Sequence, residues 1–103
     1  MPPTTRRMSF DAYVVETLMP DLVGLDGQPS AFLVYLYLWA QARGLRSRVV
    51  PASYAQIAFG TGLSRSAVQA AVTTLKRRQL IGVHRGSPTA VPRYAVLRPW
   101  QRG

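Results

Sequence analysis

The sequence lacks cysteine and contains only one histidine and four acidic residues. Without cysteine, disulfides and thiolate metal sites are excluded, and a reducing cytoplasm is compatible with the composition. The single histidine, His84, has no cysteine and no nearby acidic residue that could share a metal ion with it. We therefore expect no metal site.

The residue types that carry most enzymatic catalysis are equally scarce. The four acidic residues lie in the first 26 positions and show no paired spacing typical of acid/base catalysis. One histidine and no cysteine remove most arrangements of a nucleophile with its base. The Gly60-Thr61-Gly62 segment is too short to be a phosphate-cradling glycine motif. We expect a protein that is not an enzyme and binds no cofactor.

Long apolar segments are also missing. The strongest apolar run, the ten residues from Ala31 to Ala40, is far too short to span a bilayer. Asp11 and Glu16 interrupt what would be the apolar core of a signal peptide. We expect a soluble, cytoplasmic protein with no membrane partner.

Positive charge is what the sequence has in excess, and this charge is unevenly placed. The chain has 13 basic and four acidic residues, for a formal net charge of +9. All the acidic residues precede position 27, whereas residues 27–103 contain eleven basic residues and no acidic one. Such a stretch cannot neutralise its own positive field, so a polyanion is the natural partner. Nucleic acid is one interpretation, beside membrane phosphates and a basic surface that only keeps the protein soluble.

The 103 residues are enough for one domain with one core, and the pattern divides them at position 28. Residues 1–28 read as a basic arm and a helix, and Ser9 is expected to cap that helix at Phe10. Pro20 should end or bend the helix, and residues 20–28 read as loop and turn. Residues 29–103 form the second unit.

A second helix is expected from Pro29 to about Gly44. Its residues 31–40 are apolar nearly all round, which is typical of a helix central to a core or buried in a dimer. A strand is the competing interpretation, because tyrosine, valine and tryptophan favour strands. The aromatic residues of this segment could form a ligand cage, but at helical spacing they are more often core. Residues 46–51 then read as one edge strand ending in proline.

Residues 53–81 predict two helices separated by a glycine turn. Ser53 caps a short helix from Tyr54 to about Phe59, and Gly60-Thr61-Gly62 breaks it. Ser64 caps the next helix, from Arg65 to about Arg78. At 100° per residue, one arc of this helix gathers its apolar side chains. These are Ala67, Val68, Ala71, Val72 and Leu75.

The opposite arc of the same helix carries residue types that a DNA-reading face needs. Arginine bonds bidentately to guanine, glutamine to adenine, and serine or threonine to bases or phosphates. Because the first turns of such a helix enter the major groove, Arg65, Ser66 and Gln69 are the best base-contact candidates. Two strands, 83–85 and 93–98, follow around a polar loop in which Arg85 and Arg93 are candidate phosphate or minor-groove contacts. The full candidate DNA-binding set is Ser53, Tyr54, Ser64, Arg65, Ser66, Gln69, Thr73, Lys76, Arg77, Arg85 and Arg93.

Residues 29–98 resemble the winged helix-turn-helix domains of bacterial transcription regulators, and also those of plasmid and phage replication initiators. The resemblance is carried by Tyr54-Ala-Gln-Ile-Ala, Thr61-Gly-Leu-Ser-Arg-Ser-Ala-Val and Leu75-Lys-Arg-Arg-Gln-Leu-Ile. It implies a mainly α fold with a small β-wing: a three-helix core, an N-terminal helix and a two- to three-stranded antiparallel sheet. Phe59 and Gly60 depart from the usual polar helix end, and Gln79 stands where such domains usually have glycine.

The function that this resemblance implies is sequence-specific binding of double-stranded DNA by a transcriptional regulator or repressor. Helix 64–78 would lie in the major groove and the wing, 83–98, on the backbone or minor groove. Two alternatives stay open: a DNA-binding module of a replication initiator or partition protein, and a winged-helix adaptor for proteins. A homodimer through residues 10–40 would suit palindromic sites. No effector pocket is evident from the sequence, so the effector is unknown.

Overall fold

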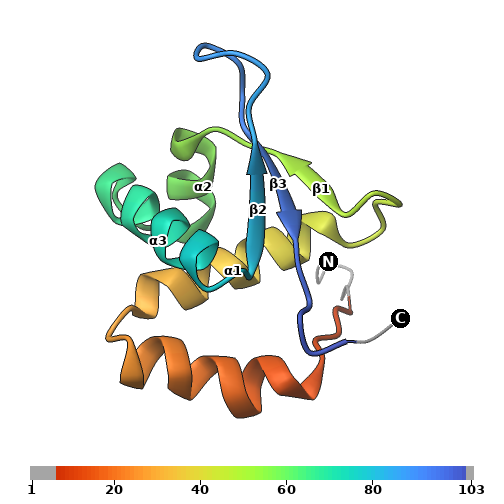
Figure 1. The fold of residues 1–103 in the computed structure, drawn as a ribbon, viewed down its shortest axis with the longest axis vertical. Helices are drawn as coiled ribbons and strands as arrows, with labels where there is room; N and C mark the ends of the chain where they lie inside the picture. The colour runs from red at the N-terminus through yellow and green to blue at the C-terminus, as the bar shows by residue number, and fades with distance from the viewer. Residues whose placement is uncertain (1–6, 102–103) are drawn as a thin grey trace, which may run out of the picture.

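The computed structural model describes residues 7–101, and these form four helical segments and one small antiparallel sheet (Figure 1). The first helical segment consists of η1 (Val14–Leu18) and η2 (Pro20–Leu25), both of the wide π type. The others are α1 (Pro29–Ala42), α2 (Tyr54–Thr61) and α3 (Arg65–Arg77). The strands are β1 (Val49–Pro51), β2 (Ile81–His84) and β3 (Arg93–Val96). Within the described residues, no helix is long and apolar enough to cross a membrane.

The sheet has the order β1-β3-β2, so β1 is an edge strand, as its composition predicts. It is shorter than the expected 46–51, and its Pro51 stands opposite Arg93 of β3. β2 begins two residues before the expected position 83, because Ile81 is buried and pairs with Val96. The two longer strands carry a loop that projects away from the N-terminal helical segment (Figure 1).

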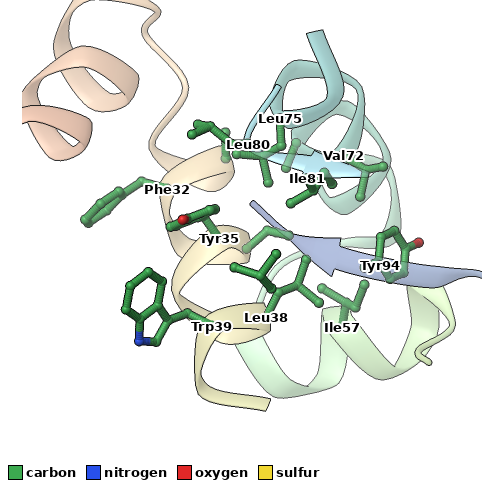
Figure 2. Close-up of a cluster of buried hydrophobic side chains, with 14 of the residues drawn as sticks. Phe32, Tyr35, Leu38, Trp39, Ile57, Val72, Leu75, Leu80, Ile81 and Tyr94 are labelled. Atoms are coloured by element: carbon green, nitrogen blue, oxygen red, sulfur yellow. The ribbon is translucent and has the colours of Figure 1, made fainter. Parts of the chain in front are cut away.

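Helix α1 is the centre of the core, and its helical assignment is confirmed. Leu38 points toward the sheet, whereas Phe32 and Trp39 point to the other side of α1 (Figure 2). Tyr35 and Trp39 are thus core residues, at 0% and 5% exposure. The same cluster includes apolar side chains of every other helix and of all three strands. Its further members in Figure 2 are Ile57, Val72, Leu75, Leu80, Ile81 and Tyr94.

The N-terminal segment differs from the expectation in two ways. Helical structure begins at Ala12, and Ser9 does not cap it; its carbonyl instead accepts a hydrogen bond from Trp39 Nε1 at 2.9 Å. The expectation that residues 20–28 are loop is wrong, because η2 continues to Leu25. The helical backbone runs from η1 through Met19 into η2, and Pro20 is the first residue of η2. Leu22 is fully buried, so the apolar face continues past the proline.

The turn between α2 and α3 is also shorter than expected. Helix α2 runs through Gly60 to Thr61, so only Gly62 breaks it, with a φ of 80°. A Cβ at position 60 would collide with the ring of Tyr37, which shows how closely α2 approaches α1 there. Ser53 caps α2 as predicted, because its Oγ accepts the Gln56 N–H at 3.1 Å.

Two buried phenols in the core have different surroundings. Tyr35 Oη donates a hydrogen bond to the Leu97 carbonyl at 2.9 Å. Tyr94 Oη is buried without a hydrogen-bond partner among residues 7–101. Burial raises the pKa of both phenols, that of Tyr94 to about 12, so both stay neutral at physiological pH. Burying this unpaired hydroxyl costs free energy, which the apolar packing around Tyr94 offsets.

Gln79, two residues after the end of helix α3 at Arg77, has the left-handed backbone that favours glycine, with a φ of 58°. Gln79→Gly should raise the free energy of unfolding by about 0.5–1 kcal/mol, because it relieves the left-handed strain. Urea denaturation measures the change. Gln79→Ala is the control and should give no gain, since alanine carries the same steric penalty. A Gln79→Gly protein no more stable than Gln79→Ala would contradict the assignment of strain.

Candidate nucleic-acid interface

The first part of the candidate site is the exposed face of α3, which is positioned by its opposite face. Ser64 Oγ accepts the Ala67 N–H at 3.1 Å, so the predicted cap is present and the helix starts at Arg65. The side chains of Val68, Ala71 and Leu75 are fully buried against the core. The helix cannot rotate about its axis without exposing them, so the direction of its polar face is set.

The three candidate base contacts lie on this exposed face. Arg65, Ser66 and Gln69 are all exposed to solvent. Ser66 Oγ lies 3.2 Å from Ser64 Oγ, whereas the side chains of Arg65 and Gln69 form no hydrogen bond within residues 7–101. Their donors and acceptors are therefore available to a ligand. Burial of these three side chains would exclude α3 as a helix that contacts bases, and they are not buried.

The remaining α3 candidates extend the same face toward its C-terminus. Thr73 is exposed, and its hydroxyl donates to the Gln69 carbonyl at 3.1 Å, which leaves its acceptor lone pairs free. Lys76 and Arg77 are exposed in the last turn. Their positive charges also suit the negative end of the helix dipole.

Ser53 and Tyr54 serve the fold of α2 as well as lying at its N-terminus. Ser53 forms a capping box with Gln56, in which the Ser53 N–H donates to Gln56 Oε1 at 2.8 Å. Tyr54 is half-buried and packs against the core. The spacing of Ser53 and Gln56 matches the sequence pattern of a capping box, but only Ser53 was identified as a cap from the sequence.

The β2–β3 loop contains the two other candidates, and they differ. Arg85 Nη1 donates to the carbonyls of Pro88 and Ala90, at 3.3 and 3.2 Å. The guanidinium thus braces its own loop. Arg93 is exposed on β3, opposite Pro51 and His84 of the neighbouring strands. Its charge is available at the base of the loop.

Three of the four acidic residues pair with arginines that are not in the candidate set. Arg78 lies 3.4 Å from Asp21 and 3.5 Å from Asp26, and Arg98 lies 3.9 Å from Asp11. These are the ion pairs found within residues 7–101, so three of the four carboxylates are engaged near the N-terminal helical segment. The candidate cations without an acidic partner in that range are Arg65, Lys76, Arg77, Arg85 and Arg93.

A second group of arginines, in the loop between α1 and β1, was not identified from the sequence. Arg43, Arg46 and Arg48 are exposed, and Arg48 has a left-handed backbone with a φ of 54°. Residues 46–48 were expected to be strand, but the strand begins only at Val49. Three arginines within six residues were a signal that could have identified this loop as a charged surface.

Comparison of the chain with family models, curated proteins and solved structures gives no match. A functional assignment therefore rests on the arrangement of side chains. That arrangement combines an exposed polar face on α3, a projecting β2–β3 loop and carboxylates that lie elsewhere. Such a surface suits a ligand that is large, negatively charged and contacted at several points.

The neighbouring residues Arg77 and Arg78 should contribute differently to stability. Arg78→Ala removes the contacts with Asp21 and Asp26, whose side chains are partly exposed. It should lower the free energy of unfolding by about 0.5–1 kcal/mol at low salt and by less at high salt. Arg77→Ala is the matched control and should change stability by less than about 0.5 kcal/mol. Equal losses in urea denaturation for both variants would show that the ion pairs are not formed.

Proposed function

We propose that this protein binds double-stranded DNA as a winged helix-turn-helix protein, with α3 as its recognition helix. The observation that carries the proposal is the free, exposed set Arg65, Ser66 and Gln69 at the start of a helix whose other face is in the core. The element order α1-β1-α2-α3-β2-β3, with β1 paired to β3, resembles that of winged helix-turn-helix domains. In this assignment the β2–β3 hairpin is the wing.

The proposed mechanism separates base reading from phosphate binding. The first turns of α3 enter the major groove, where Arg65 bonds a guanine and Gln69 an adenine. Lys76, Arg77 and Arg93 neutralise phosphates and set the register of the protein on the duplex. Because Arg85 is engaged in its loop, its role is to shape the wing.

The biological role that fits such binding is that of a transcriptional regulator, most simply a repressor. Such a protein would act by occupying its site on DNA and blocking or recruiting other machinery. Among the described residues, no group of three or more side chains that could hold a metal ion is found. The protein would be associated with the nucleoid when bound.

DNA affinity should depend steeply on salt and on two arginines in distinct ways. With six or more phosphate contacts, affinity should fall about a thousandfold between roughly 50 and 200 mM salt. Arg65→Ala should weaken binding to the preferred site by about 1–3 kcal/mol and relax the preference there. Arg77→Ala should weaken binding to all sequences alike and lower the salt slope by about one unit. Selection of bound sequences from a random duplex pool, followed by fluorescence anisotropy at several salt concentrations, measures both effects.

Arg78→Ala is the matched control for Arg77→Ala, because its guanidinium faces Asp21 and Asp26. It should leave the salt slope unchanged. Unaltered site preference in Arg65→Ala would mean that α3 does not read bases. If the folded wild-type protein shows no salt-dependent DNA binding, the DNA-binding proposal is wrong, and the interpretation as a protein-interaction adaptor replaces it.

We further propose that two copies pair through residues 10–40. Val15, Met19 and Val23 form an exposed apolar strip at a spacing of four on the N-terminal helical segment. Apolar side chains clustered on one face mark an association surface more often than scattered ones. Pairing about a two-fold axis would present two α3 helices to a palindromic site.

Self-association should disappear when a charge is placed in this strip. Met19→Glu, in the middle of the strip, should shift the protein to monomer in sedimentation equilibrium, because a carboxylate would be buried at the contact. Val91→Glu, at an exposed apolar residue in the β2–β3 loop, is the control and should leave the oligomeric state unchanged. A wild-type protein that is monomeric at every concentration would refute the dimer while leaving the DNA-binding proposal untouched.

A further inference from the structure

A polar pocket of about 430 Å³ lies on a part of the molecule that the proposed DNA contacts do not use. Four arginines line it: Arg7 near the N-terminus, Arg43 and Arg48 around the α1–β1 loop, and Arg98 after β3. No residue of α3 or of the β2–β3 loop takes part. In Figure 1, the α1–β1 loop lies on the opposite side of the molecule from α3.

The charge of this pocket is poorly compensated. Among the residues that the structure describes, Arg7, Arg43 and Arg48 have no acidic partner, and Arg98 has only Asp11, at 3.9 Å. The same Asp11 oxygen also accepts hydrogen bonds from Trp100 Nε1 at 2.9 Å and from Gln101. Its charge is therefore shared among several donors. The Nε atom of Arg98 is buried without a hydrogen-bond partner within residues 7–101.

Contacts from several segments hold the arginines in place. The Arg98 guanidinium lies over the Trp39 ring, with 4.1 Å from Cζ to the ring centroid. Arg43 Nη1 donates to the Arg7 carbonyl at 3.5 Å. The Arg48 carbonyl accepts the Val96 N–H at 3.3 Å, which ties the left-handed backbone of this residue to the sheet. Strained backbone held by surrounding structure is concentrated at ligand-binding sites.

We propose that this pocket binds a small, multiply charged phosphorylated anion, at a site separate from the DNA-binding face. Convergent guanidiniums match the oxygens of phosphate groups bidentately, and several negative charges are needed to offset three unpaired arginines. The ligand is recognised by its phosphates and not by an aromatic ring. Trp39 is only 5% exposed, because it stacks with Phe10 and Trp100 and lies under Arg98.

Isothermal titration calorimetry with inorganic pyrophosphate tests the proposal on the full chain. The wild-type protein should bind one pyrophosphate saturably. Arg43→Gln combined with Arg48→Asn should weaken this binding about tenfold or more, because two charge-assisted contacts are lost. Asparagine is chosen at position 48 because it accepts a left-handed backbone. Arg46→Gln is the matched control, since Arg46 lies in the same loop outside the pocket, and should change affinity less than about twofold.

Equal pyrophosphate affinity in all three proteins, or no saturable binding by the wild type, would overturn the proposal. Circular dichroism verifies the fold; if the double variant is unfolded, Arg43→Gln alone is compared with Arg46→Gln by the same criterion.

Duplex DNA binding of the same proteins distinguishes a free phosphorylated ligand from a DNA phosphate. Equal DNA affinity of the double variant and Arg46→Gln supports a separate site. Selective loss of DNA affinity in the double variant would assign the pocket to the DNA interface and would overturn the proposal of a separate site. Pyrophosphate binding does not require DNA, so its outcome is independent of the proposed function.

Discussion

The structure depends on the burial of one face of α3 against α1. The fully buried side chains of Val68 and Leu75 meet the apolar surface of α1, whose own far side is covered by the N-terminal helical segment. Because apolar burial is the dominant favourable term in folding, this contact decides how α3 is rotated. The polar side chains of α3 point to solvent as a consequence. Rigid support of this kind keeps functional groups within the small tolerances that recognition requires.

Charge is distributed in a way that reinforces this arrangement. The N-terminal helical segment brings carboxylates to Arg78 and Arg98, and both pairs connect segments far apart in the sequence. The acidic residues thus serve the packing of the N-terminal segment on the domain. The remaining arginines divide into two groups, one around α3 and the wing and one around the pocket at the end of α1.

Local signals in the sequence predicted most of α3 and its cap. Ser64, the glycine turn at Gly62 and the apolar spacing of the helix are all encoded within a few residues, so they could be identified without tertiary information. The apolar residues on all sides of α1 predicted a helix that is central to the core or buried in a dimer, and α1 lies in the core. The left-handed backbone of Gln79 accounts for a departure from the usual glycine without changing the fold.

Tertiary contacts decided what the sequence pattern could not. Proline at position 20 reads locally as a helix end, but burial of Leu22 outweighs that signal. Gly60 reads as a break in the sequence, yet it lies inside α2. Glycine fits there because the ring of Tyr37 leaves no room for a Cβ. The arginine-lined pocket joins residues from opposite ends of the chain, so no local window could reveal it.

The contacts of Arg85 have a consequence for the kinetics of recognition. Its guanidinium bonds two carbonyls of the β2–β3 loop, so that loop has its shape before any ligand arrives. The conformational entropy of the loop is then lost during folding instead of during complex formation. An encounter between this hairpin and a partner needs no ordering step, and collisions in the correct orientation can proceed directly to the bound state.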